Sequence, residues 1–227
     1  MRYILIPVKD LGRAKQRLSS LMSQEQRTVL AMELLRHTLA TAAAVSEANG
    51  VAVVTLYPPA IRLAKDFGFM VIGEDRQISE SDSVDFGSRE AMSAGARAVL
   101  RLPIDLPWIT AQDIDAILTL DQPESPQSVD QRSVVIVPSR DGTGTNAILR
   151  RPPDLFPSRF GTGSLAKHRE EAHQIGIPCQ ICENPNIAFD IDEPADVAHL
   201  LEDQRPCRIR EIVGEILSGR DISKNLP

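Results

Sequence analysis

The feature that most limits the fold of this chain is the alternation of short apolar runs with longer amphipathic segments. A helical pattern between the first two runs is predicted to begin at Ser23, which forms a capping box with Gln26. Strand-length apolar runs occupy positions 3–8, 50–56, 68–73, 97–105 and 133–139. An order of strand, helix, strand throughout predicts an α/β fold with a mostly parallel central sheet and helices on both faces.

Weaker patterns complete this prediction. Further helices are predicted to begin near Ser83 and at Thr110, and 177–183 is predicted to be a strand. The polar stretch 120–132 is interpreted as a surface loop. Because 227 residues suffice for one sizeable α/β domain, we expect a single domain over 1–227, with 206–227 as a C-terminal helix and tail.

Composition limits the partners and the compartment. A net charge of -6 gives no basic field, so we expect no nucleic acid as a main partner. No apolar run reaches the length of a membrane span, and the apolar start is too short for a signal peptide, so we expect a cytoplasmic protein with no membrane partner. Cys179 and Cys182 are expected on opposite faces of a strand, which favours a structural role over a redox pair or zinc site.

Charged residues gather where ligands of such sheets bind, beyond the carboxyl ends of the strands. Asp105 lies at the end of the fourth apolar run, and Asp190 and Asp192 lie near the end of the chain. Cations follow the first run, namely Lys9, Arg13, Lys15 and Arg17. Cations at one strand end and carboxylates at two others suit a nucleoside triphosphate with a divalent metal, because the cations neutralise phosphate oxygens while carboxylates hold the metal.

Each of these groups also has a structural interpretation. A cationic loop is often only a solvated surface, and Asp105 could be a turn residue. Asp192 precedes Pro194 by two residues, which favours a role as the N-cap of the helix that follows. Asp190 lies in an apolar, strand-like run, where an ionised carboxylate is costly unless it is paired or bound to metal.

Two glycine-rich loops suggest an anion site. The stretch 137–153 is neither a Walker loop nor a dinucleotide fingerprint, because no Gly-Lys-Ser or Gly-Lys-Thr occurs and an extended segment follows. Its backbone N–H groups, with Thr143, Thr145 and Asn146, suit a small anion or a phosphorylated acid.

The second loop, 159–168, has the same chemistry. Gly161 and Gly163 permit close approach of backbone, and Ser164 could cap a helix whose N-terminus faces an anion. His168 and His173 are on different faces of that helix and do not form a metal pair, although His168 could lie near the ligand. Both loops could converge on one ligand.

The segments 6–18, 105–107, 137–153, 159–168 and 189–197 together resemble the guanylyltransferases of deazaflavin coenzyme (factor-420) biosynthesis. These enzymes act on 2-phospho-L-lactate, phosphoenolpyruvate or 3-phosphoglycerate. The resemblance implies a three-layer nucleotidyltransferase fold of the glycosyltransferase-A type. It also implies transfer of GMP from GTP to the phosphate of a small phosphorylated carboxylic acid, with release of pyrophosphate.

The resemblance also implies roles for single residues. Asp105 and Asp190 would hold Mg²⁺, with Asp192 as the alternative second carboxylate, and Lys15 would act with Asp105 and Asp190 in catalysis. The residues that would face the triphosphate are Lys9, Lys15 and Arg17. The residues that would bind the acid are Thr145, Asn146, Gly161 and Ser164. The acid, the strictness for GTP and a possible homodimer stay open, as do two alternatives: another small-molecule nucleotidyltransferase, and a non-catalytic nucleotide or phosphometabolite sensor.

Overall fold

The structure is a computed structural model that describes residues 1–121 and 132–219. Most of the predicted surface loop 120–132, and the last residues of the predicted C-terminal tail, lie outside these ranges.

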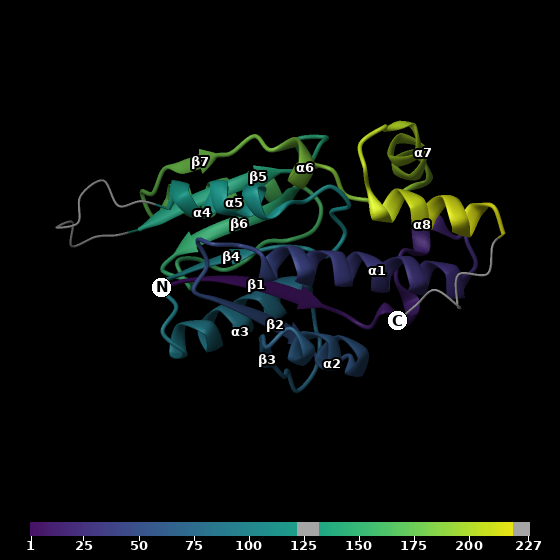
Figure 1. Cartoon of the computed structure of the whole chain (residues 1–227). Coiled ribbons are helices and arrows are strands. Elements are labelled where there is room, and N and C mark those ends of the chain that lie inside the picture. Colours follow the sequence, from purple (N-terminus) through teal and green to yellow (C-terminus); the bar gives the residue numbers. More distant parts are fainter. Residues whose placement is uncertain (122–131, 220–227) are drawn as a thin grey trace.

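A seven-stranded sheet in the order β3-β2-β1-β4-β6-β5-β7 forms the centre of the molecule (Figure 1). Its strands are β1 (Arg2–Val8), β2 (Gly50–Thr55), β3 (Met70–Ile72), β4 (Ala98–Arg101), β5 (Ser133–Pro138), β6 (Thr145–Arg151) and β7 (Cys179–Ile181). All neighbouring pairs are parallel except those of β6 with β4 and with β5. The expected mostly parallel sheet is therefore confirmed.

The strict alternation of strand and helix was wrong at one point. A short turn, not a helix, joins β5 to β6, so β6 runs antiparallel to both of its neighbours. This turn is the first half of the glycine-rich stretch 137–153, and it brings that loop to the sheet edge where β5 ends.

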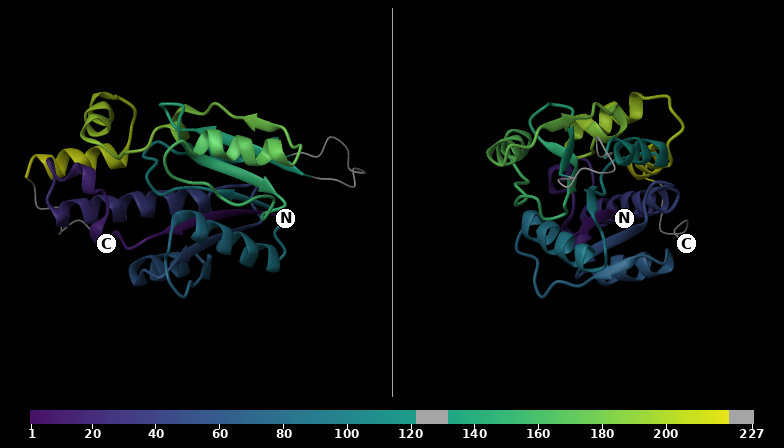
Figure 2. Two further views of the ribbon diagram at one scale, coloured as in Figure 1. Left: turned by 180° about the vertical axis from the view of Figure 1, so that it is seen from behind. Right: turned by 90° about the vertical axis from the view of Figure 1, so that its left-hand side faces the viewer.

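Helices cover both faces of the sheet, as expected (Figures 1 and 2). On one face lie α1 (Gln24–Ala43), α2 (Pro58–Asp66) and α4 (Ala111–Leu120), and on the other lie α3 (Glu80–Ser93) and α5 (Ser164–Gln174). The chain also forms the short 3-10 helices η1 (Leu11–Arg13) and η2 (Gln16–Leu18), and the helices α6 (Pro185–Ala188), α7 (Pro194–Glu202) and α8 (Arg208–Leu217).

Alternate residues of each strand supply the two core layers, as the two-residue period of a strand requires. In β1, Ile4 and Ile6 pack on the side of α1, while Leu5 packs on the side of α3. The predicted strand at 177–183 is shorter in the structure, where β7 covers Cys179–Ile181. Cys182, directly after it, packs against the first layer and Cys179 against the layer under α5, so the two cysteines face opposite sides as expected. Both thiols are free, and the structural role expected for them stays a prediction.

Local capping signals predicted two helix starts correctly. Ser23 caps α1 in a capping box with Gln26, and Thr110 caps α4 in a capping box with Asp113. The start of α3 was predicted too late, because its N-cap is Ser79. The fourth strand is also shorter than expected: β4 ends at Arg101, and the chain leaves the sheet before Asp105.

The C-terminal helices form a second apolar cluster outside the sheet. Helix α8 lies beside α1 (Figure 1), and buried residues of α1, η2, α7 and α8 pack together there. Trp108 stacks on Phe189 with 4.0 Å between ring centroids, so the single tryptophan serves packing. The cluster holds the segment after α6 against the rest of the protein.

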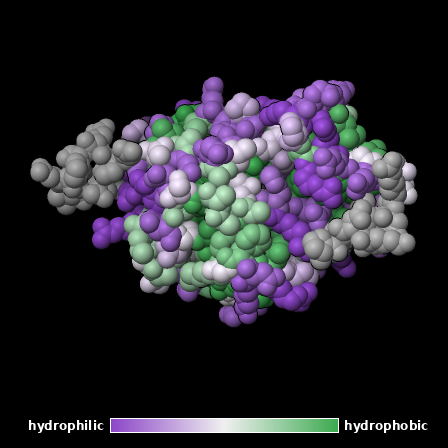
Figure 3. Space-filling model, in the orientation of Figure 1, coloured by the Kyte–Doolittle hydropathy of each residue, from purple (hydrophilic) through white to green (hydrophobic). Residues whose placement is uncertain are grey.

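The surface is mixed in character. On the face in Figure 3, hydrophobic residues gather near the centre and hydrophilic residues lie around them. Among the described residues, no helix combines the length and the apolar character needed to cross a membrane. The possible homodimer stays a prediction.

Candidate active site

Four charged side chains from distant parts of the chain meet beyond the carboxyl ends of β1 and β4. Lys15 Nζ lies 3.0 Å from Asp105 Oδ2 and 2.8 Å from Asp192 Oδ1. Asp105, Asp190 and Asp192 each place a carboxylate oxygen within 4.8 Å of the others. The structure thus brings together the lysine and all three carboxylates that the sequence singled out.

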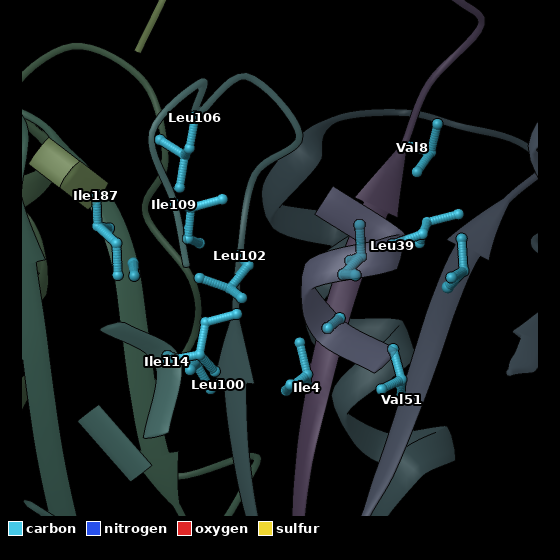
Figure 4. Packing of buried hydrophobic residues seen from close by; sticks show 14 of the residues in the cluster. Ile4, Val8, Leu39, Val51, Leu100, Leu102, Leu106, Ile109, Ile114 and Ile187 are labelled. Carbon is cyan, nitrogen blue, oxygen red and sulfur yellow. The ribbon is translucent and has the colours of Figure 1, made fainter. Parts of the chain in front are cut away.

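Apolar anchors hold Asp105 in place. Leu102 and Leu106 are fully buried on either side of it, and the backbone N–H of Ile191 donates to its carbonyl oxygen at 3.1 Å. Figure 4 shows Leu102, Leu106 and Ile109 on the segment after β4, with Ile187 of α6 nearby. The position of the carboxylate therefore depends on the core more than on the flexibility of its loop.

The segment that carries Asp190 and Asp192 is not a strand, contrary to the expectation from its apolar pattern. It passes beyond the sheet and does not pair with any of the strands β1 to β7. Instead, the backbone N–H of Ile191 donates to the carbonyl of Asp105. Ile191, between the two carboxylates, is fully buried. Burial of Phe189 and Ile191, two positions apart, thus explains the strand-like pattern.

Asp192 does not cap α7, so that prediction was wrong. The N-cap is Glu193, which forms a capping box with Asp196. Asp196 Oδ2 also accepts the backbone N–H of Asp192 at 3.0 Å. Because Asp196 satisfies these backbone donors, the carboxylate of Asp192 is left to pair with Lys15.

The carboxylates have opposite electrostatic environments. Burial and the nearby charge of Asp105 raise the pKa of Asp190 to about 6, although the amide of Asn146 acts against them. Burial would raise the pKa of Asp105 as well, but Lys15 and Arg101 outweigh it and lower that pKa. Burial alone would lower the pKa of Lys15, but Asp105 and Asp192 outweigh it and raise that pKa. The cluster therefore has one cation for three acids and is short of positive charge.

Lys15 also has an uncommon backbone. Its φ of 54° and ψ of 42° are left-handed, a conformation that costs free energy for a residue with a Cβ. Strained backbone of this kind concentrates at functional sites. Here it lies between η1 and η2 and directs the ammonium group to the carboxylates.

Two clefts meet at this cluster. The first cleft, of about 320 Å³, is lined by residues after β1, including Lys9 and Lys15, and by Gln77 and Ser83. The second cleft, of about 600 Å³, is lined by the two glycine-rich loops and by Asp190. Both clefts share Glu80, Arg101, Pro103, Asp105 and Asp192. Ligands in the two clefts would therefore meet at the carboxylates.

The two glycine-rich loops converge, as expected. Leu165 N–H of the second loop donates to the carbonyl of Thr143 in the first at 3.1 Å. Within the first loop, Asp141 accepts from the hydroxyl of Ser139 and from Thr143, and these bonds lower the pKa of Asp141 to about 2. The turn is therefore preformed, and the Thr143 hydroxyl is engaged within it.

The four residues expected to bind the acid all line the second cleft. Thr145 begins β6, and Gly161 has a φ of 105°, which favours glycine. Ser164 is the first residue of α5 and not its cap; that position belongs to Gly163, in a left-handed conformation. The prediction that Ser164 caps this helix was wrong, although the residue is buried in the cleft wall.

The side-chain amide of Asn146 forms its hydrogen bonds with other residues of the protein. Its amide donates to the carbonyls of Ile187 and Ala188 at 2.9 and 3.0 Å and to Asp190 Oδ1 at 3.2 Å. These bonds fix Asp190 and its segment to β6. The structure therefore places Asn146 behind the acidic cluster, where its amide holds a carboxylate.

The expected cations separate between the clefts. Lys9 and Lys15 line the first cleft, whereas Arg17 lines the second and pairs with Glu193 at 3.2 Å in an exposed position. Such an exposed pair contributes little to stability and leaves the guanidinium able to move.

Arg101 and Glu80 line both clefts but were not predicted from the sequence. Arg101, almost fully buried, donates to the Asn146 carbonyl at 2.8 Å, pairs with Glu80 and lies 4.3 Å from the ring centroid of Phe160. A charged residue inside the apolar run of β4 was the available signal, because a buried charge requires a partner. Glu80 carried no comparable signal.

The known proteins that this chain resembles in sequence are guanylyl transferases. A family model described as "Guanylyl transferase CofC like" matches residues 1–212. A phosphoenolpyruvate guanylyltransferase of Sphaerobacter thermophilus is 33% identical over 196 residues, covering 86% of this chain and 90% of that protein. The same enzyme of Rubrobacter xylanophilus is 34% identical, covering 87% and 92%. A 3-phospho-D-glycerate guanylyltransferase of Colwellia psychrerythraea is 28% identical, covering 86% and 88%.

Solved structures match at the level of the fold. A Desulfovibrio desulfuricans G20 protein, assigned to the nucleotide-diphospho-sugar transferases, has a TM-score of 0.76 at 16% identity, covering 98% of this chain and 99% of its own. The 4-diphosphocytidyl-2C-methyl-D-erythritol synthase of Anaerococcus prevotii has a TM-score of 0.56 at 10% identity, covering 88% and 93%. The expected α/β nucleotidyltransferase fold is confirmed.

Proposed function

The chain belongs to the CofC-like guanylyl transferase family, and from that premise we propose that it joins GMP from GTP to the phosphate of phosphoenolpyruvate or 3-phosphoglycerate. The reaction releases pyrophosphate and makes an activated acid for the synthesis of the deazaflavin coenzyme factor-420. The observation that carries the proposal is the pair of clefts that share Asp105 and Asp192 at their junction.

The two clefts suit the two substrates. The first cleft would take GTP, with Lys9 and Lys15 facing its phosphates, and the second would take the phosphorylated acid. Thr145, Gly161 and Ser164 would bind that acid, because the second cleft offers hydroxyls and the N-terminus of α5 to an anion. Arg17 and Arg140 add cations at the rim of the second cleft.

The transfer step needs no strong base. A phosphate oxygen of the acid attacks the α-phosphorus of GTP, and the bond from that phosphorus to the oxygen bridging to the β-phosphate breaks. The electron pair leaves with pyrophosphate. Because the attacking oxygen is already anionic, the residues of the site act by alignment and by neutralising charge. Lys15 supplies a buried positive charge at the junction.

The acidic cluster fits Mg²⁺. Three carboxylate oxygens within 4.8 Å of one another are the hard donors that this ion prefers, and among the described residues Lys15 is the one cation that forms a direct ion pair with them. Asp105, Asp190 and Asp192 would hold the ion. When bound, Mg²⁺ would neutralise phosphate oxygens and orient the reacting phosphates.

A substrate panel tests the proposal. Purified protein is incubated with Mg²⁺ and each of the four NTPs, crossed with phosphoenolpyruvate, 3-phosphoglycerate and 2-phospho-L-lactate, and pyrophosphate release is measured. Phosphorus NMR then identifies the new diphosphate bond. We expect turnover with GTP and with phosphoenolpyruvate or 3-phosphoglycerate.

Two variants control the panel. Asp190→Asn removes one carboxylate of the cluster and should be inactive, whereas Asp66→Asn removes an exposed carboxylate at the end of α2 and should be fully active. Silence of the folded wild type with every acid would contradict the proposal. Binding of nucleotide without turnover would instead favour the sensor, and turnover with a different acceptor would favour another nucleotidyltransferase.

A further inference from the structure

His168 on α5 lies directly behind the second cleft. Its side chain is fully buried, with Nδ1 3.0 Å from Thr145 Oγ1 and Nε2 2.8 Å from the backbone nitrogen of Arg159. Phe160 meets the ring edge-on at 4.9 Å between centroids. Thr145 lines the second cleft, but His168 does not. The histidine therefore contacts a cleft residue while remaining outside the cleft itself.

The hydrogen bonds determine which ring nitrogen carries the proton. A backbone N–H can only donate, so Nε2 must accept from Arg159 and carries no proton. A neutral imidazole has one N–H, which must then be at Nδ1. Nδ1–H therefore donates to Thr145 Oγ1.

The ring stays neutral in this position. Burial is the largest cause, and the charges of Arg150, Arg101, Arg159 and Lys167 add to it, so the pKa of His168 is lowered to about 3. Across the ordinary working range of pH, the ring keeps one donor and one acceptor.

This arrangement fixes the direction of the Thr145 hydroxyl. Because Oγ1 accepts from Nδ1–H, its own proton must point elsewhere, and within the described residues no acceptor is hydrogen-bonded to it. The direction that remains is the second cleft, which Thr145 lines. The hydroxyl is then a fixed donor toward an anion in that cleft.

We propose that His168 is a positioning residue that orients the Thr145 hydroxyl as a hydrogen-bond donor to the phosphorylated acid. The identity of the ligand rests on the proposed function; the orientation of the hydroxyl does not. His168 contacts no reacting atom in this scheme and acts only through Thr145. The expected effect is on binding of the acid, not on GTP.

The tautomer can be measured without turnover. Long-range proton–nitrogen correlation NMR on protein labelled with ¹⁵N-histidine distinguishes Nδ1–H, Nε2–H and doubly protonated rings. The chain has four histidines, so the signal that disappears in His168→Asn identifies residue 168. We expect Nδ1–H at pH 7. A ring protonated at Nε2, or at both nitrogens, would overturn the proposal.

Two matched variants separate the two hydrogen bonds. In His168→Asn the amide nitrogen occupies the place of Nδ1 and keeps the donor to Thr145, but the acceptor for Arg159 is lost. In His168→Gln the terminal oxygen can reach the place of Nε2 and keep that acceptor, but the donor to Thr145 is lost. We expect KM for the acid to rise about tenfold in His168→Gln and about twofold at most in His168→Asn. KM for GTP should change little in either variant.

A double-mutant cycle with Thr145→Val completes the test. If His168 acts through Thr145, His168→Gln has no further effect on KM for the acid once the hydroxyl is gone. Additive losses, equal losses in the Asn and Gln variants, or a parallel rise in KM for GTP would each refute the positioning role. An inactive wild type with the Nδ1–H tautomer intact would contradict the proposed function and leave the tautomer standing.

Discussion

The same chemical change at two carboxylates of the cluster should shift stability in opposite directions. In the absence of metal, Asp190→Asn is expected to stabilise the protein and Asp105→Asn to destabilise it. The reason is that burial and the charge of Asp105 raise the pKa of Asp190, whereas Lys15 and Arg101 lower that of Asp105. In the folded state, Asp190 is repelled by the charge of Asp105, whereas Asp105 is paired with Lys15.

The magnitude for Asp190 follows from its pKa. The ordinary value is 3.8 and the folded value about 6, so above pH 6 the folded state carries a cost of about 3 kcal/mol, at about 1.4 kcal/mol for each tenfold change in proton affinity. The cost develops as pH rises from 3.8 to about 6 and is absent below that range, where Asp190 is protonated in both states. Asparagine removes it and keeps an oxygen that can accept from Asn146.

For Asp105 the sign reverses. Its neutral replacement leaves the ammonium of Lys15, whose side chain is 8% exposed, with Asp192 as its remaining ion-pair partner. Removing one of its two partners destabilises the folded state, because the buried ammonium is then paired with Asp192 alone.

Thermal unfolding at pH 7.5 in the presence of a chelator measures both effects. We expect the Tm of Asp190→Asn to rise by about 6 to 12 °C and that of Asp105→Asn to fall. The gain of Asp190→Asn should shrink as pH is lowered from 7 to 4. Saturating Mg²⁺ should raise the Tm of the wild type and leave that of Asp190→Asn unchanged. Shifts of the same sign in both variants without metal would refute this account of the cluster.

Three further substitutions test other parts of the site and fold. Lys15→Gln should lower kcat/KM for GTP by about 100-fold, because the buried charge at the junction of the clefts is lost; unchanged steady-state kinetics would exclude a phosphate-facing role. Asn146→Ala should weaken Mg²⁺ binding by about 10- to 100-fold in calorimetry, since Asp190 loses its amide donor, and equal affinity would show that the core alone holds that carboxylate. Gly87→Ala should lower the free energy of unfolding in urea by about 1 to 3 kcal/mol, because the added Cβ would lie 2.3 Å from Val54 Cγ2; a neutral effect would mean that α3 shifts freely on the sheet.

Local physics let the sequence determine the elements and the kinds of chemistry. The caps at Ser23 and Thr110 depend on residues within one helical turn, so their pattern is visible along the chain. The ends of parallel strands predict where ligands bind, which explains why Lys15 and Asp105 could be singled out from the sequence. Asp190 was singled out for a different reason, because a carboxylate in an apolar run is costly unless it is paired or bound to metal. The family resemblance added GTP and the phosphorylated acids, which strand patterns cannot specify.

Other predictions failed where a distant contact replaced a local one. Asp192 has the spacing of an N-cap, but Asp196 supplies the backbone acceptors, and Asp192 pairs with Lys15 across 177 positions of the chain. The run around Ile191 has the pattern of a strand, but its backbone bonds to Asp105 beyond the sheet. A local sequence pattern is compatible with more than one structural role for a residue, and contacts with residues distant in the chain determine which role it has.

The pattern of apolar runs was enough to predict β1 to β5 and β7 in their order along the chain and the charges that follow them, but it predicted neither β6 nor the end of β4 at Arg101. The tertiary structure alone decided that β6 lies antiparallel between β4 and β5, which joins Arg101 to Asn146 and brings Asn146 to Asp190. It also decided that His168 lies behind Thr145. The physical reason is that these contacts join segments whose separation along the chain carries no signal, so they exist only once the sheet has set its strand order.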